Sequence, residues 1–204
     1  MTEYLTEQEQ LQQLVNWIKQ YGPSLFIGIL IAIFATSGWH YWQRHLNNNL
    51  MQASDTYTTM LSQDDRNEII KQANVLLDQY PKTPYAQMAS LMLARDAIEQ
   101  NHLTDANTRL EWAMTHGKDA TLRSIARLRL ARLLIAEQKP TDALKLLDPL
   151  EDNSFNGLAD EIRGDAAVAL HQTDVAKKNY AKALTEISHN DDTQPLLQLK
   201  YNEL

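Results

Sequence analysis

The pattern of apolar and polar residues changes twice along the chain. Up to residue 23, apolar residues such as Leu11, Leu14, Val15 and Ile18 recur at helical spacing among polar ones. An almost unbroken apolar stretch follows, and the sequence from residue 25 reads LFIGILIAIFATSGWHYWQRH. From residue 44 onward, apolar residues again recur every three or four positions, which predicts amphipathic helices. The chain is therefore predicted to be all-α, with three parts at residues 1–23, 24–43 and 44–204.

The apolar stretch has the length of a membrane span. No Lys, Arg, Asp or Glu occurs in residues 20–43. As a helix, residues 24–42 would extend over roughly 28 Å, close to the hydrocarbon thickness of a bilayer. Aromatic rings followed by a cation are typical of the membrane surface. The stretch ends in such a predicted interfacial belt: Trp39, Tyr41, Trp42 and Arg44. Residues 24–43 are thus predicted to form a single transmembrane helix.

A cleaved signal peptide is the alternative to a retained anchor. Ala35-Thr36-Ser37 follows the apolar run and has the small-x-small pattern of a signal peptidase site. A signal peptide begins with a short basic region, whereas 24 residues precede this run and carry three Glu and one Lys. The sequence favours an anchor, with cleavage after Ser37 as the alternative. One cation flanks each end of the stretch, Lys19 and Arg44, so the positive-inside rule gives no orientation.

Residues 1–23 are predicted to form a short amphipathic helix. Thr6-Glu7-Gln8-Glu9 is a capping box, and Gly22-Pro23 is a stop signal. Such a helix either lies on the membrane or on a partner, or only positions the span that follows it. The single Lys in this segment favours the positioning role.

The rest of the chain repeats one spacing of small and large residues. In each copy a small residue is followed by a second small residue twelve positions later, a large residue four further and another residue three further. The four copies, of which the first is degenerate, are Leu61-Ala73-Leu77-Tyr80, Ala94-Ala106-Leu110-Ala113, Ala131-Ala143-Leu147-Leu150 and Gly164-Ala176-Tyr180-Ala183. Their second members lie 33, 37 and 33 residues apart. Small residues let two helices approach closely, and the large residue fills the groove between pairs, so stacked helical hairpins are predicted.

This spacing resembles the tetratricopeptide repeat, a helical hairpin of about 34 residues. Thr83-Pro84 and Pro140 are start signals for helices, and His116-Gly117 is a stop signal. The sequence departs from the repeat at three positions where an aromatic residue is expected: Ser90, Arg127 and Asp160. We expect a partial first repeat that continues the membrane helix to about Leu61, three further repeats, and a capping helix at QPLLQLKYNEL.

Composition narrows the possible functions. The chain has 26 acidic and 19 basic residues, a net charge of -7, which argues against nucleic-acid binding. It has no cysteine, which excludes disulfides, thiolate metal sites and a cysteine nucleophile. It has no glycine-rich phosphate loop, no HExxH and no GxSxG. We therefore expect no enzymatic activity, no cofactor and no metal.

A binding role is predicted for the concave face that the first helices of stacked repeats form. The tetratricopeptide pattern places a candidate partner-binding groove at six residues of two repeats: Met88, Leu91, Arg95, Ile125, Leu128 and Arg132. The third repeat would add Leu158, Glu161 and Asp165. Apolar residues beside Arg95 and Arg132 suit an extended or helical peptide that carries an acidic group. Alternatively, Arg123, Arg127, Arg129 and Arg132 solvate one helix and pair with nearby acids.

The order of segments resembles the YfgM family, ancillary subunits of the bacterial SecYEG translocon. The resemblance covers the whole chain and rests on EQLQQLVNWIKQYG, GWHYWQRH, EIRGDAAVALHQTDVAKKNYAKAL and QPLLQLKYNEL. It implies a single-pass protein of the bacterial inner membrane, with a cytoplasmic N-terminus and periplasmic repeats. It implies SecYEG, a PpiD-like periplasmic chaperone and secretory proteins as partners. The alternatives are another membrane-tethered repeat adapter, for instance for cytochrome or outer-membrane assembly, and a secreted protein or enzyme cleaved after Ser37.

Overall fold

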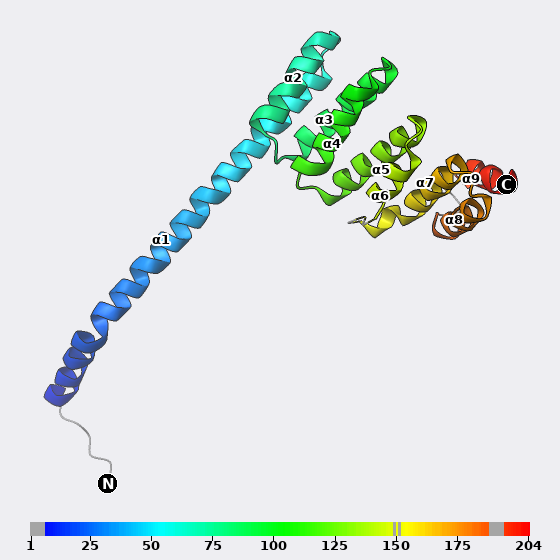
Figure 1. Cartoon of the computed structure of the whole chain (residues 1–204). Helices are drawn as coiled ribbons and strands as arrows, with labels where there is room; N and C mark the ends of the chain where they lie inside the picture. Colours follow the sequence, from blue (N-terminus) through cyan, green and yellow to red (C-terminus); the bar gives the residue numbers. More distant parts are fainter. Residues whose placement is uncertain (1–6, 149, 151, 188–193) are drawn as a thin grey trace. The chain divides into compact units, whose positions relative to one another are not determined.

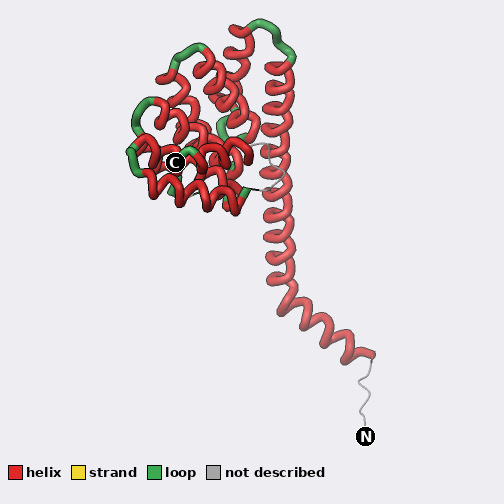
Figure 2. Tube along the Cα trace, turned by 90° about the vertical axis from the view of Figure 1, so that its right-hand side faces the viewer, coloured by secondary structure: helices red, strands yellow, loops and turns green. Residues whose placement is uncertain are grey.

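The computed structural model of the chain describes residues 7–148, 150, 152–187 and 194–204. This part of the chain is helical and contains no strand (Figure 2), which confirms the all-α prediction. The helices are α1 (Glu7–Leu61), α2 (Arg66–Gln79), α3 (Pro84–Glu99), α4 (Leu103–His116), α5 (Ala120–Ala136), α6 (Pro140–Leu146), the 3-10 helix η1 (Asn153–Phe155), α7 (Asn156–Ala169), α8 (Thr173–Glu186) and α9 (Gln194–Asn202). They form two units, Met1–Asn49 and Leu50–Leu204.

Helix α1 is long and bent. It continues through Gly22-Pro23, where the sequence predicted a stop, but bends by 44° between Val15–Gly22 and Phe26–Leu61. Proline lacks an N–H, and its ring clashes with the preceding turn, so a kink is the expected result of a proline inside a helix. The predicted helix that leaves the apolar stretch and ends near Leu61 is confirmed, since α1 ends at this residue.

Within the described residues, no straight helical segment has both the length and the hydropathy of a membrane span. The two segments of α1 on either side of its bend have them when they are taken together. In the predicted interfacial belt, Trp39, Tyr41 and Trp42 have most of their surface exposed, and Arg44 is exposed as well. The predicted capping box begins at Thr6, which lies outside the described residues. The side chains of Leu14 and Ile18 also lie outside them.

The second unit is a stack of helical hairpins (Figure 1). The end of α1 packs on α2 and α3 through one hydrophobic cluster, and α3 pairs with α4, α5 with α6, and α7 with α8. Helix α9 packs against α8 at the end of the stack. The small residues of the predicted spacing are fully buried: Ala73, Ala106, Ala143 and Ala176. The predicted stack of helical hairpins is therefore confirmed, and α9 lies where the capping helix was predicted.

Helix boundaries of the second unit follow the predicted signals, but α6 is shorter than its counterparts. Thr83 accepts a hydrogen bond from the N–H of Ala86 at the start of α3, and α6 begins at Pro140. Helix α6 is only 7 residues long, however, whereas α4 and α8 each have 14. Pro149 follows in the sequence, and proline disfavours helix both at its own position and at the preceding residue. Leu150 of the predicted spacing therefore lies beyond α6, although it still packs against the cluster around Leu147.

Three first helices end in the same unusual turn, which the sequence did not reveal. The second residue after the helix has a positive φ in each case: 59° at Asn101, 62° at Gln138 and 59° at His171. The next N–H donates to a carbonyl five residues back, at 2.8 Å from His102, 2.8 Å from Lys139 and 2.9 Å from Gln172. This is the hydrogen bond of a Schellman cap, a position that glycine usually occupies. Without glycine as a signal, these caps are invisible in the sequence.

Candidate partner-binding surface

The six residues of the predicted groove lie on α3 and α5, at matching positions of two hairpins. Leu91 and Leu128 are only 6% and 4% exposed, and they belong to the hydrophobic core. Met88 and Ile125 are half-buried. The two arginines, Arg95 and Arg132, are exposed. Four of the six residues therefore offer surface to a partner, and the groove itself stays a prediction.

Among the residues that the structure describes, Arg95 pairs with one acid, Glu99, which lies on its own helix and is exposed. Its Nε donates to Glu99 Oε1 at 2.8 Å, one turn further along α3, and both side chains are more than half exposed. Pairs of this kind contribute a few tenths of a kcal/mol, roughly 0.3–0.5, because water solvates both charges well. Arg95 can therefore exchange Glu99 for an acidic group of a partner at little cost.

Arg132 is engaged across the stack. Its Nη2 donates to Glu161 Oε2 on α7 at 3.0 Å, and the Glu161 side chain is only 8% exposed. Removing Arg132 would take away one of the cations that compensate this buried carboxylate, which is costly. The alternative interpretation, in which these arginines pair with nearby acids, is thus confirmed for Arg132.

Lys200 of α9 binds two acidic side chains of α7. Its Nζ donates to Glu161 Oε1 at 2.8 Å and to the two carboxylate oxygens of Asp165 at 2.8 and 2.9 Å. The Tyr180 hydroxyl donates to Asp165 Oδ1 at 2.7 Å. We name this connected set the charge ladder: Arg132, Glu161, Lys200 and Asp165. It joins α5, α7 and α9, and it takes up the two acids that the third repeat was predicted to present.

The charge ladder shifts the pKa of two neighbouring groups in the same direction. Burial alone would lower the pKa of Lys200, but the hydrogen bonds to Asp165 and Glu161 outweigh it, and the pKa is raised. Burial raises the pKa of Tyr180, and its hydrogen bond to Asp165 raises it further. Both groups keep their protons at neutral pH. Neither is poised to transfer a proton, as a general acid or base needs to be.

A second ionic cluster surrounds Asp160 of α7, at one of the positions where an aromatic residue was expected. Asp160 is 1% exposed, and it binds Arg163 Nη1 and Lys182 Nζ, each at 2.6 Å. Arg163 also donates to the carbonyl of Leu147 at 2.8 Å and to Asp148 at 2.7 Å. These bonds connect α7 to α8 and to the end of α6. Ionic contacts therefore join α7 to its neighbours at the position where an aromatic residue was expected.

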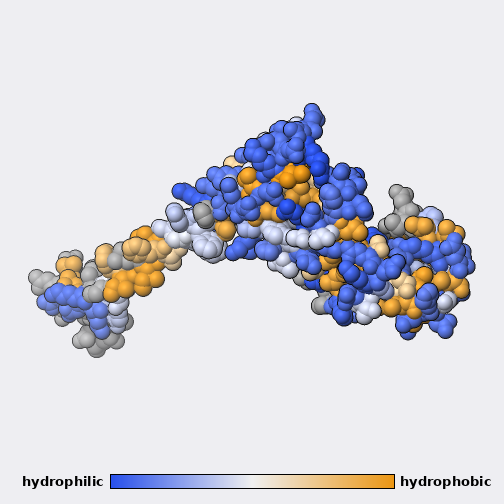
Figure 3. All heavy atoms as spheres, turned by 45° about the horizontal axis from the view of Figure 1, so that its top comes forward, coloured by the Kyte–Doolittle hydropathy of each residue, from blue (hydrophilic) through white to orange (hydrophobic). Residues whose placement is uncertain are grey.

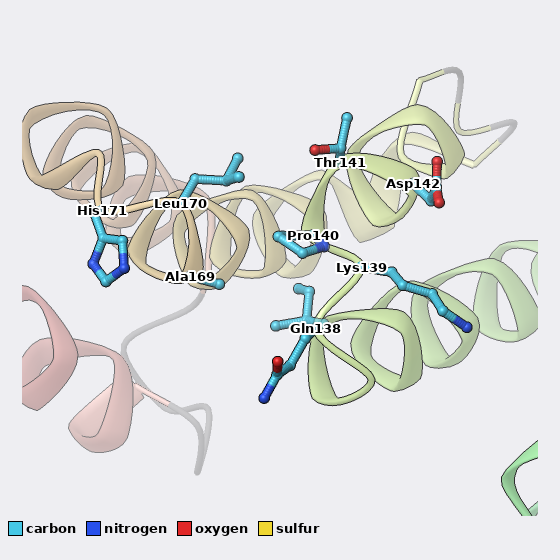
Figure 4. A pocket seen from close by; sticks show the side chains of 9 residues that line it. Gln138, Lys139, Pro140, Thr141, Asp142, Ala169, Leu170 and His171 are labelled. Atoms are coloured by element: carbon cyan, nitrogen blue, oxygen red, sulfur yellow. The ribbon is translucent and has the colours of Figure 1, made fainter.

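A hollow of about 760 Å³ lies where the α5–α6 turn meets the α7–α8 turn (Figure 4). It is lined by Ile135, Gln138, Lys139, Pro140, Thr141, Asp142, Ala169, Leu170 and His171. The hydrogen bond that Lys139 donates to Glu137 raises the pKa of Lys139, and a hydrogen bond from Lys145 lowers the pKa of Asp142. Both charges are thus engaged in local ion pairs. Within the described part of the chain, no group of three or more His, Asp or Glu side chains is placed to hold a metal.

Gln87 of α3 fixes the turn before α5, a role that the sequence analysis missed. Its amide is fully buried and donates to the carbonyls of Ala113 and Asp119 at 3.0 and 3.4 Å. The N–H of Asp119 donates back to Gln87 Oε1 at 3.2 Å. Gly117 lies so close to this amide that a Cβ there would be 1.6 Å from Gln87 Cδ. The glycine was interpreted as a helix stop alone, although it also makes room for Gln87.

Comparison with known proteins adds to this geometry. Residues 15–204 match the protein family described as "Tetratricopeptide repeat-like domain". A Haemophilus influenzae protein named "Ancillary SecYEG translocon subunit" is 29% identical over 202 residues, with 98% of each chain covered. Proteins of the same name from Escherichia coli and Neisseria gonorrhoeae are each 26% identical over 208 residues, with 98% and 100% of both chains covered. No solved structure matches the chain. The resemblance found in the sequence is thereby confirmed.

Proposed function

Because the chain belongs to the tetratricopeptide repeat-like family, we propose that it is a non-enzymatic adapter of the SecYEG translocon in the bacterial inner membrane. The observation that carries the proposal is the full-length similarity to three proteins named for this translocon, which covers at least 98% of each chain. Stacked helical hairpins present an extended surface on which an adapter can bind its partners.

Residues 24–43 are the proposed membrane anchor. Phe26, Ile31 and Phe34 are more than half exposed, so no protein core covers them. A helix that exposes so many apolar side chains needs another apolar environment, which the bilayer supplies. The interfacial belt would then lie at the headgroups. The resemblance supports a cytoplasmic N-terminus and a periplasmic domain at residues 44–204.

Two measurements test the anchor and its orientation. Intact mass spectrometry of the protein extracted from membranes should find the apolar stretch still attached, whereas a chain beginning at Gly38 would overturn the anchor. Protease added to spheroplasts should digest residues 44–204. Protection of these residues until the inner membrane is broken would overturn the proposed orientation.

The repeat domain is the proposed binding site for a PpiD-like periplasmic chaperone and for secretory proteins. Met88, Arg95 and Ile125 contribute accessible surface, and Arg95 is paired only within its helix. A partner segment with an apolar residue near an acid would contact the two apolar side chains and replace Glu99 as the partner of Arg95. Arg132 is less available because it holds the buried Glu161.

Purification of the full-length protein from membranes in a mild detergent tests the function. SecYEG and the chaperone should be recovered with the wild type. The double variant Arg95→Glu, Ile125→Asp should lose at least tenfold in recovered chaperone, whereas Lys71→Glu, a matched charge reversal at an exposed residue of α2, should lose none. Recovery of a cytochrome or outer-membrane assembly complex in place of SecYEG would overturn the proposal in favour of the other adapter.

A further inference from the structure

Ion pairs join α9 to α7 as they join α7 to α5. Arg132 on α5 is bonded to Glu161 on α7 at 3.0 Å, and Asp165 on α7 is bonded to Lys200 on α9 at 2.8 Å. Arg132 and Asp165 hold matching positions, because each directly follows the first small residue of its repeat. Helix α9 is therefore aligned with the first helix of a fourth hairpin, and Lys200 takes the place of Glu161.

This alignment identifies the side of α9 that a second helix would cover. In two of the complete hairpins, the residue before the Glu161 position contacts the second helix. Ser90 donates a hydrogen bond to the carbonyl of Arg109 on α4 at 2.8 Å, and Asp160 binds Lys182 on α8 at 2.6 Å. Leu199 holds this position on α9. With the residues one turn before and after it, it forms what we name the terminal face: Leu196, Leu199 and Glu203.

The terminal face is uncovered, unlike its counterparts. Leu196 and Leu199 are 55% and 53% exposed, and Glu203 is exposed as well. The matching residues of α7 are all buried: Gly157, Asp160 and Gly164. Hydrophobic atoms reach the surface at the end of the domain that carries α8 and α9 (Figure 3). Among the described residues, Glu203 has no ion-pair partner for its carboxylate.

We propose that the terminal face binds an amphipathic helix of another protein, which completes a fourth hairpin in trans. The second helices of the complete hairpins indicate what this helix must carry. They cover their first helices with a large residue between small ones, as in Ala106-Leu110-Ala113 and Ala176-Tyr180-Ala183. Asp160 is met by Lys182 of α8, and a Lys or Arg of the incoming helix meets Glu203 in the same way. This surface shares no residue with the predicted groove.

A second copy of the chain fits the terminal face less well. Two half-exposed leucines from each copy provide far less than the roughly 1,000 Å² that a stable interface buries. The helices of this chain that carry the small-large-small spacing, α4 and α8, already bury it in their own hairpins. A separate helix has its whole apolar stripe available and extends the interface along α9, as α8 does along α7.

A synthetic peptide tests this proposal. The probe is a fluorescently labelled peptide of residues 172–187, which carries the Ala176-Tyr180-Ala183 stripe of α8 and three lysines. Fluorescence anisotropy with the full-length protein in detergent should show saturable binding. Leu199→Glu should weaken binding at least tenfold and Glu203→Lys several-fold. Val175→Glu, the matched control at a residue of α8 that is 48% exposed, should leave it unchanged.

Each other outcome overturns the proposal. Absent binding, or equal binding by the wild type and Leu199→Glu, would show that the terminal face takes no such helix. A dimer that Leu199→Glu converts to a monomer, measured by light scattering after size exclusion, would identify a second copy as the occupant. Circular dichroism checks the fold of each variant, and Leu196→Glu replaces Leu199→Glu if the latter denatures early. SecYEG recovery is a separate measurement, so the two proposals fail independently.

Discussion

Replacing Gly117 with Ala tests whether the buried amide of Gln87 and the turn before α5 form one rigid contact. The added Cβ would lie 1.6 Å from Gln87 Cδ and 2.0 Å from both Cγ and Nε2. Gly117 has φ -77° and ψ 155°, a conformation that alanine adopts without strain. Any loss of stability therefore comes from the collision and not from the backbone.

The size of the loss follows from what Gln87 must give up. Its amide has to leave its site to make room for the methyl group. The hydrogen bonds to Ala113 and Asp119 are then broken, at a net cost of about 0.5–1.5 kcal/mol each. Overpacking of a buried site typically costs about 1–3 kcal/mol. The bond at 3.4 Å is weak, so we expect the free energy of unfolding to fall by about 2–4 kcal/mol.

Urea denaturation of the full-length protein in detergent, followed by circular dichroism, measures this loss. A double-mutant cycle with Gln87→Ala isolates the contact, because Ala at position 87 has no amide to collide with. In that background, Gly117→Ala should cost less than about 0.5 kcal/mol. An equal loss in both backgrounds, or no loss in the wild-type background, would refute the reasoning.

Three further changes test other contacts of the repeat domain. Gln138 has φ 62°, a conformation that costs a non-glycine residue about 1 kcal/mol. Gln138→Gly should therefore raise the free energy of unfolding by about 0.5–1 kcal/mol. In the control Gln100→Gly, at φ -87°, the free energy of unfolding should fall. A Cβ on Gly164 would lie 2.2 Å from the Tyr180 ring, so Gly164→Ala should cost about 1–3 kcal/mol in urea denaturation, and less when Tyr180 is replaced with Leu. Folding raises the pKa of Lys200 and of Tyr180, so their protonated forms stabilise the folded state at pH values below their unfolded pKa of about 10. This contribution is lost as the pH rises further, so the urea midpoint of the wild type should fall at alkaline pH, and that of Lys200→Met should fall less. An equal fall in both proteins would contradict this.

The repeat framework was predictable because it depends on local spacing. A small residue such as Ala106 or Ala176 must face the helix that precedes it, and this requirement recurs with every hairpin. Residues that start and stop helices act over one turn, so Thr83 and Pro140 were interpreted correctly. The sequence therefore predicted the hairpins, their order and their buried small positions.

The candidate surface was less predictable because it depends on how the hairpins stack. Leu91 and Leu128 were expected to line a groove, but neighbouring hairpins close over them. The charge ladder joins Glu161 to Arg132 and to Lys200, which are 29 and 39 residues away. Nothing in the local pattern selects these partners among the other arginines and lysines. Periodicity thus identifies a face of a helix, whereas the tertiary stack decides which residues on that face remain available.

The charged residues of α3 and of α7 differ in how easily a partner can bind them. On α3, Arg95 pairs with Glu99 of its own helix, an exposed contact that costs little to exchange. On α7, Glu161 is buried and held by Arg132 and Lys200 from two other helices, so displacing either cation removes part of the compensation of a buried carboxylate. A partner on the inner side is therefore expected near α3, whereas the terminal face lies beyond the ladder on α9. Because the two surfaces share no residue, Arg95→Glu should weaken chaperone recovery alone, and Leu199→Glu should weaken binding of the helical peptide alone. In the double variant, each of the two should be no weaker than in the corresponding single variant.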